Sequence, residues 1–157
     1  MVGHSRWMVP ISLLLCIIVT RIVSPVIAFS TSAGFTLPLE STGMYNFTVD
    51  WGDNVSSSIT LYNQSERMHT YASQGIYQLV ISGQVRGWRF NNGGDKLKIL
   101  ELSQWGSLNF GNSDSYFYGA SNLKLTASDA PDLNSTTSLY QTFYYCENLG
   151  SEGNMNG

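Results

Sequence analysis

The feature that most restricts the fold is the strict alternation of apolar and polar residues between positions 45 and 51. The apolar members are Tyr45, Phe47, Val49 and Trp51. A period of two places them on one face of a half-buried β-strand. Residues 58–62, 76–82 and 85–90 give further strand patterns, separated by turn-forming residues such as the Asn-Asn-Gly-Gly run at 91–94. Short strands with turns about 10 residues apart predict an antiparallel β-sandwich.

The first 28 residues have the pattern of a signal peptide. His4 and Arg6 precede an apolar run over residues 7–19, and a second apolar stretch covers residues 22–29. The end of this stretch, Val26-Ile27-Ala28, favours cleavage after Ala28. The alternative is a membrane anchor over residues 7–29, which would place Arg21 in the bilayer at a cost of about 2.5–3.5 kcal/mol. We therefore expect a secreted or cell-surface protein that meets a membrane only through this segment.

Composition limits the possible functions. Charged residues make up 12% of the chain, the formal net charge is −3, and no basic run occurs. Binding to nucleic acid through phosphate neutralisation is therefore not expected. Cys16 lies in the expected leader, so Cys146 would be the single cysteine of the mature chain, without a disulfide or a cysteine metal site. We expect no metal and no cofactor.

The central part of the chain resembles the PKD module. The resemblance is carried by the segment Tyr45-Asn-Phe-Thr-Val-Asp-Trp-Gly-Asp53 and by the His-x-Tyr…Gly-x-Tyr-x-Leu pattern between residues 69 and 79. It implies an immunoglobulin-like sandwich that serves as a spacer or contact domain outside cells. The residues to which it gives structural roles are Trp51, Asp53, His69, Tyr71, Gly75 and Tyr77.

From Lys96 onward the pattern changes to that of leucine-rich repeats. A Leu-x-x-Leu-x-Leu frame contains Leu97, Leu100 and Leu102, and it recurs as Ala120, Leu123 and Leu125 and begins again as Cys146 and Leu149. The segment from Phe117 to Leu123 also aligns with that from Phe143 to Leu149. This half resembles the BspA-like leucine-rich-repeat surface proteins, whose repeats carry a Phe-x-x-Cys-x-x-Leu core. Residues 113–118 and 138–145 would be short helical returns.

Together these patterns predict a mainly β protein with five segments. The expected layout is a signal peptide at 1–28, a linker and first strand region at 29–43, a PKD-like sandwich at 44–94, about two leucine-rich repeats at 95–149, and a disordered tail at 150–157. The array of repeats is expected to be cut short, because fewer than about three repeats seldom fold alone.

The candidate ligand-binding residues are Trp88, Glu101 and Lys124. Trp88 lies between Arg86 and Arg89, where an exposed indole could stack on a sugar. Glu101 and Lys124 occupy positions of the repeats that face the surface on which solenoids bind.

No catalytic residue is expected. His69 lacks a plausible nucleophile, and Asp50 and Asp53 have the spacing of turn residues rather than that of a calcium loop. Four Asn residues, at positions 46, 54, 63 and 134, stand in glycosylation sequons.

The sequence thus favours a non-catalytic, exported module for interaction or adhesion at a cell surface, with a protein or glycan partner. The alternatives are an architectural spacer within a larger surface protein and a secreted hydrolase.

Overall fold

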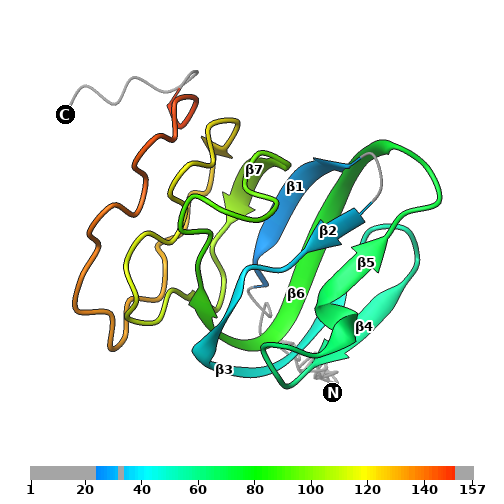
Figure 1. Cartoon of the computed structure of the whole chain (residues 1–157), viewed down its shortest axis with the longest axis horizontal. Helices are drawn as coiled ribbons and strands as arrows, with labels where there is room; N and C mark the ends of the chain where they lie inside the picture. The colour runs from blue at the N-terminus through cyan, green and yellow to red at the C-terminus, as the bar shows by residue number, and fades with distance from the viewer. Residues whose placement is uncertain (1–23, 32–33, 151–157) are drawn as a thin grey trace, which may run out of the picture.

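The computed structural model describes residues 24–31 and 34–150 (Figure 1). Residues 1–23 of the expected signal peptide, and residues 151–157 of the expected tail at 150–157, lie outside the described residues. The strands are β1 (Val26–Thr31), β2 (Gly34–Thr36), β3 (Leu39–Asp50), β4 (Ser56–Ile59), β5 (Met68–Thr70), β6 (Gly75–Trp88), β7 (Ile99–Gln104), β8 (Leu108–Asn109) and β9 (Lys124–Leu125). A short 3-10 helix, η1 (Ser65–Arg67), precedes β5.

The expectation of a mainly β protein is confirmed. One sheet has the strand order β4-β3-β6-β1-β7-β9, and β8 pairs with the end of β6. Strands β2 and β5 form a separate two-stranded sheet, which crosses in front of β1 and β6 in Figure 1. Phe35 of β2 contacts Phe29 of β1, with ring centroids 4.6 Å apart, so a layer of aromatic side chains joins the two sheets.

The alternation at residues 45–51 is confirmed. Tyr45, Phe47 and Val49 of β3 are buried and the residues between them are exposed. Trp51, directly after the strand, is also buried. Strand β4 begins two residues before the predicted position and pairs with the second half of β3.

The two strands predicted at 76–82 and 85–90 are one strand, β6, of 14 residues. The predicted break at Gly83 does not occur. Gly83 pairs with Phe47 and has a φ of 120°, and a Cβ there would lie 2.4 Å from the carbonyl oxygen of Asn46. Glycine therefore lets the strand continue where a larger residue would force the partner away.

Strand β1 crosses the expected boundary at residues 28 and 29, because its first half falls in the expected signal peptide and its second half in the expected linker and first strand region. It lies between β6 and β7, pairing Ile27 with Leu79 on one side and with Leu102 on the other. Ile27 and Phe29 have no exposed surface. Backbone pairing with β6 begins at Pro25, whose carbonyl accepts a hydrogen bond from the N–H of Ile81 at 3.1 Å. Cleavage after Ala28 would remove half of this central strand.

The first predicted repeat frame has the wrong register. Leu97 is 52% exposed and Leu100 is half-buried, whereas Ile99 and Leu102 are fully buried. Strand β7 pairs antiparallel with β1, and irregularities in that pairing decide which residues face the core. In the second frame, Leu123 is buried and Leu125 packs against the core, as predicted.

Beyond β6 the chain forms stacked turns in place of the predicted helical returns. We call residues 90–92, 115–119 and 140–145 the first, second and third turn segments. Asp114, Ser115, Gln141 and Tyr145 have φ values between 53° and 59°, and such left-handed residues cannot belong to a right-handed helix. The described residues contain no α-helix.

A ladder of backbone hydrogen bonds joins the turn segments. The N–H groups of Phe90, Asn91 and Asn92 donate to carbonyls of the second segment, at 2.9 to 3.1 Å. The N–H groups of Ser115, Phe117 and Gly119 donate in the same way to Tyr140, Thr142 and Tyr144 of the third, at 2.8 to 2.9 Å. Each turn segment is therefore held by backbone groups of its neighbour.

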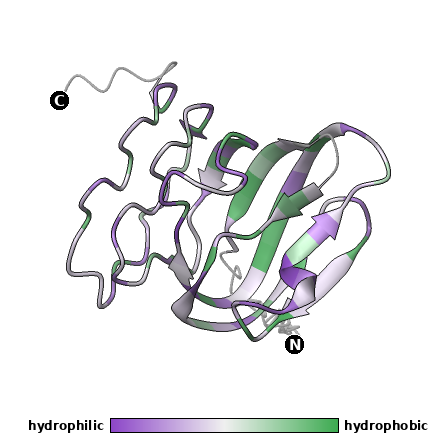
Figure 2. Ribbon diagram, in the orientation of Figure 1, coloured by the Kyte–Doolittle hydropathy of each residue, from purple (hydrophilic) through white to green (hydrophobic). Residues whose placement is uncertain are grey.

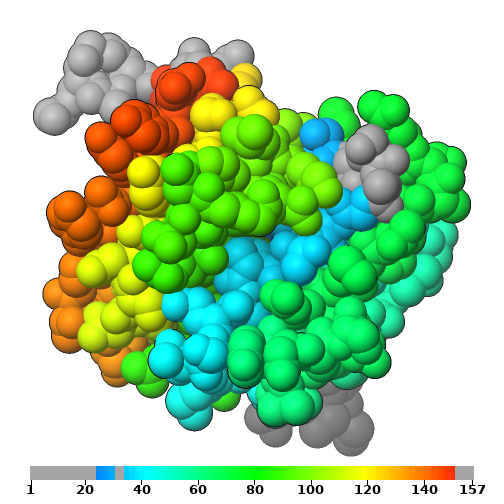
Figure 3. Space-filling model, viewed as in Figure 1, coloured from blue at the N-terminus to red at the C-terminus, as the bar shows by residue number. Residues whose placement is uncertain are grey.

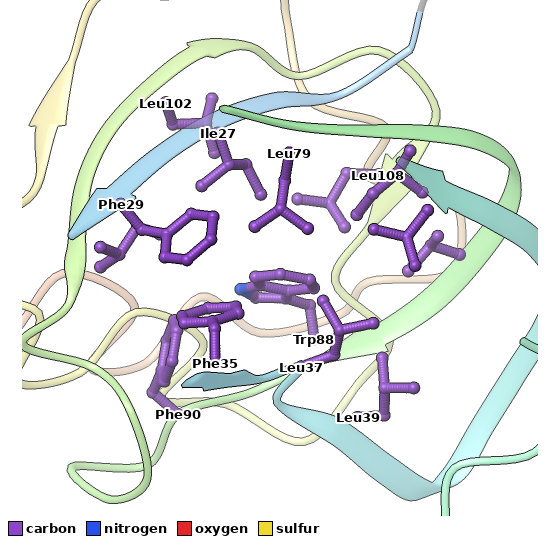
Figure 4. Packing of buried hydrophobic residues seen from close by; sticks show 14 of the residues in the cluster. Ile27, Phe29, Phe35, Leu37, Leu39, Leu79, Trp88, Phe90, Leu102 and Leu108 are labelled. Atoms are coloured by element: carbon purple, nitrogen blue, oxygen red, sulfur yellow. The ribbon is translucent and has the colours of Figure 1, made fainter. Parts of the chain in front are cut away.

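One hydrophobic core runs through the described residues and crosses the expected boundary at residues 94 and 95. Figure 4 shows Phe35 and Leu37 packed with Leu79 and Trp88, and Leu102 and Leu108 close to the same cluster. Figure 2 shows hydrophobic residues concentrated on the central strands of the sheet. The expected sandwich and the expected repeats thus share a core.

A chain that starts at Phe29 should be far less stable than one that starts at Ser24. It lacks Val26, Ile27 and Ala28, and loss of a buried aliphatic side chain alone costs about 2–5 kcal/mol. Because small domains have about 5–15 kcal/mol in total, the shorter chain should unfold at much lower urea concentration. Urea unfolding followed by circular dichroism measures this, and equal midpoints for the two chains would contradict the placement of β1.

Candidate functional site

The residues singled out by the PKD resemblance meet in one cluster. The ring of His69 stacks on Trp51 with centroids 5.0 Å apart and lies edge-on to Tyr71 at 4.5 Å. Its Nε2 is 2.7 Å from the carboxylate of Asp53. Tyr71 stacks on Tyr77 at 4.0 Å and donates a hydrogen bond to the carbonyl of Trp51 at 2.9 Å. Gly75 begins the strand that carries Tyr77.

The polar groups of this cluster are engaged in holding the turn after β3. The indole N–H of Trp51 donates to the Ser57 hydroxyl at 3.0 Å, and Asp53 accepts the N–H of Val55 at 3.2 Å. Burial raises the pKa of the Tyr71 hydroxyl, so this phenol stays protonated. The Ser57 hydroxyl is the acceptor of the indole and is not bonded to the imidazole, so the geometry does not assemble a nucleophile with a base.

Electrostatics favour the ionised form of Asp53. Partial burial acts to raise its pKa, but the hydrogen bond and charge of His69 and the N–H of Val55 outweigh that effect and lower it below 3.8. A carboxylate whose pKa is lower in the folded protein stabilises the fold above its ordinary pKa, and this contribution disappears as the pH falls through the folded value.

Trp88 does not fit the role predicted for it. Its side chain has no exposed surface and packs edge-on against Phe90, with centroids 6.0 Å apart. The strand β6 continues through residue 88, and this places the indole on the core face of the sheet. A buried indole cannot stack on a ligand at the surface.

Glu101 and Lys124, the other two candidate ligand-binding residues, lie next to each other in the sheet. They are register partners in the parallel pairing of β7 with β9. The carboxylate of Glu101 accepts a hydrogen bond from the Thr126 hydroxyl at 2.5 Å. The pair lies on a short, two-residue stretch of parallel sheet, which is a small surface for a partner.

The predicted positions of the second and third repeats also face one another. Phe117 is fully buried and stacks on Phe143, with centroids 5.6 Å apart and 16° between the ring planes. The thiol of Cys146 donates to the carbonyl of Phe117 at 3.1 Å, and burial raises its pKa to about 11. Leu149 packs on the same core. These residues are structural, and the thiol is unreactive at neutral pH.

An exposed aromatic surface formed by the second and third turn segments was not predicted from the sequence. It consists of Tyr118, Tyr140, Tyr144 and Tyr145 and is called here the tyrosine surface. Tyr140, Tyr144 and Tyr145 are 65%, 46% and 55% exposed. Tyr144 and Tyr145 stack with centroids 4.2 Å apart, and Tyr118 lies 5.3 Å from Tyr144. Only the fold could bring Tyr118 to the other two.

An apolar groove of about 440 Å³ lies beside the tyrosine surface. It is lined by Trp105, Phe110, Pro131, Leu133, Leu139, Gln141, Thr142, Phe143 and Tyr144. Leu133 and Leu139 are 39% and 51% exposed. Figure 3 shows the segment around residues 130–150, in orange to red, forming the outer left margin of the molecule. Tyr144 belongs to both features, so the groove and the tyrosine surface are continuous.

The surroundings of this surface are acidic and neutral. Residues 125–150 include Asp129, Asp132 and Glu147 but no Lys or Arg. The hydrogen bond that the Tyr144 hydroxyl donates to Tyr145 raises the pKa of Tyr144, so this phenol is uncharged at neutral pH. The surface therefore suits a neutral or basic partner with apolar groups and does not suit a polyanion.

Other kinds of site are not found in the described part of the chain. Residues 24–31 and 34–150 contain no group of three or more His, Cys, Asp or Glu side chains placed to hold a metal ion. No helix within these ranges is long and apolar enough to span a membrane. The four sequon Asn side chains are exposed.

No family model, curated protein or solved structure matches the chain.

The Asp53–His69 pair should make stability fall in acid. Replacing Asp53→Asn removes the carboxylate, so the wild-type advantage in thermal midpoint should be full at pH 6 and shrink as the pH falls below 3.8. Thermal melts between pH 2 and pH 7 test this, with the exposed Glu147→Gln as the control. A difference that stays constant with pH would show that Asp53 acts only as a neutral turn residue.

Proposed function

We propose that this protein is an exported, non-catalytic module that binds a partner at a cell surface through the tyrosine surface and its groove. The observation that carries the proposal is the exposed cluster of tyrosines beside an apolar groove at the end of the stacked turns. Tyrosine is enriched in binding interfaces because its ring supplies apolar area and its hydroxyl can hydrogen bond. Exposed apolar patches of this kind are typical of interaction sites.

We further propose that the two halves are a PKD-like sandwich and the beginning of a leucine-rich-repeat array. The cluster of Trp51, His69 and Tyr71 supports the first assignment. Recurrent contacts support the second: Asn122 donates to the carbonyl of Leu97, 25 residues earlier, and Asn148 donates to that of Ser121, 27 residues earlier. Strands β7 and β9 pair in parallel, as strands of neighbouring repeats do.

The partner class is a protein or a glycan. Apolar walls contributed by Leu133, Leu139 and Phe143 favour a partner with an aromatic or aliphatic group, and the phenols of Tyr144 and Tyr145 offer hydrogen bonds to its rim. The alternative function is that of an architectural spacer. The continuous core across the two halves favours it, since that core makes the protein a single stiff unit.

Replacing the exposed tyrosines should strongly weaken binding without unfolding the protein. We expect Tyr144→Ser with Tyr145→Ser to weaken adhesion to a panel of immobilised matrix proteins and glycans by at least about 30-fold, since aromatic hot spots contribute about 2 kcal/mol or more. The control is Tyr62→Ser, because Tyr62 is 40% exposed on the distant β4–η1 turn. Surface plasmon resonance measures both. Equal binding by the wild type and the double variant would contradict the tyrosine surface, and no binding by either would favour the spacer.

A further inference from the structure

The third turn segment repeats the backbone of the second. Ser115 and Gln141 have φ values of 56° and 53°, and Gly119 and Tyr145 have values of 82° and 57°. The N–H groups of Tyr118 and Ala120 donate to the carbonyls of Ser115 and Phe117, and those of Tyr144 and Cys146 donate to Gln141 and Phe143. Gln141, Phe143 and Tyr145 are therefore the equivalents of Ser115, Phe117 and Gly119.

This equivalence identifies an open row of hydrogen-bond donors. The N–H groups of Ser115, Phe117 and Gly119 donate to the following turn segment. For their equivalents in the third segment, no acceptor lies among residues 24–31 and 34–150. In Figure 1 this segment, in orange, lies at the outer left edge of the described chain. Three backbone donors at regular spacing thus face outward beside the groove.

The row offers donors but not acceptors. The carbonyls of Gln141 and Phe143 already accept hydrogen bonds from Tyr144 and Cys146 within the turn. In a symmetric contact, a second copy of the chain would present the same donors through the same face, so the two donor rows could not pair with each other. Its acceptor carbonyls, such as those of Tyr140 and Thr142, are used by its own second turn segment. The occupant must bring carbonyls of its own.

The internal interface indicates the shape of that occupant. Where the third segment meets the second, its carbonyls come from a chain of consecutive turns, and Phe143 stacks on Phe117. An extended strand spaces its alternate carbonyls more widely than such turns do. The outer face of Phe143 lines the groove, and this is the surface on which an equivalent aromatic ring would stack.

We propose that the donor row Gln141–Phe143–Tyr145, with its groove, is a docking site for a turn segment of the same kind on a partner polypeptide. The partner runs parallel to residues 141–145, supplies three backbone carbonyls, and places an aromatic residue on Phe143. This inference rests on the proposed binding function and adds to it the backbone geometry of the partner. It extends to the end of the stack the kind of interface that joins the second and third turn segments.

Joining the partner segment covalently tests the docking geometry directly. A second copy of residues 125–150, with Cys146→Ala in the copy, is inserted after Gly150. Tethering raises the effective concentration, so low intrinsic affinity does not hide docking. Hydrogen exchange by NMR should show the amides of Gln141, Phe143 and Tyr145 slowed by at least about tenfold relative to the parent chain, as expected when local opening is required for exchange.

The matched control insert carries Phe143→Asp in the added copy only, and it should leave the three amides as fast as in the parent. The amides of Ser115, Phe117 and Gly119 should be slow in every version, which reports that the stack is intact. If the first insert disturbs them, a copy of residues 99–124 replaces it. Three outcomes would overturn the inference: fast exchange at 141, 143 and 145 with both inserts, equal slowing by the control, or slow exchange already in the parent.

Failure here and failure of the proposed function are distinguishable. Binding to the panel of matrix proteins and glycans depends on the side chains of Tyr144 and Tyr145 and uses the chain without an insert. Slowed amides without binding to the panel would overturn the proposed function alone. Binding to the panel without slowed amides would overturn the docking geometry alone.

Discussion

The position of β1 between β6 and β7 is the constraint on which the rest of the structure depends. On one side it completes the antiparallel sheet of the N-terminal half, and on the other it holds β7, which in turn pairs in parallel with β9. Ile27 and Phe29 fill the core at this junction. Without β1, the main sheet path between β6 and β7 would be broken, and β7 would lose its antiparallel partner. This strand therefore joins the two halves of the chain in one sheet with one hydrophobic core.

The hydrophobic core continues through the stacked turns by way of aromatic contacts between neighbouring segments. Trp88 and Phe90 lie against Phe117, and Phe117 lies against Phe143, whose own outer face lines the groove. The same order holds for the backbone, because each turn segment donates to the next until the third has no acceptor among the described residues. Among the described residues, the third segment therefore has a neighbouring turn segment on one side only. The tyrosine surface, its groove and the end of the stack are thus parts of one region of the molecule.

The sequence was informative where chemistry is local. The alternation in β3 requires one buried face, and the pattern of Trp51, Asp53, His69 and Tyr71 produced a real cluster because these side chains hold a tight turn. The spacing of Phe117 and Phe143 correctly placed two rings in equivalent positions. Trp88 shows the limit of such arguments. Its flanking arginines indicated exposure, but the uninterrupted strand through Gly83 directed the indole into the core.

The sequence by itself determined that the chain is mainly β, which face of β3 is buried, and that side-chain positions recur in its second half. These follow from side-chain periodicity, which acts over a few residues. Tertiary structure decided the rest. Whether Val26–Ala28 belongs to a leader or to a central strand depends on pairing with residues far along the chain, at positions 78–80 and 101–104. The tyrosine surface and the donor row exist only because turns about 25 residues apart are stacked, which no local pattern specifies.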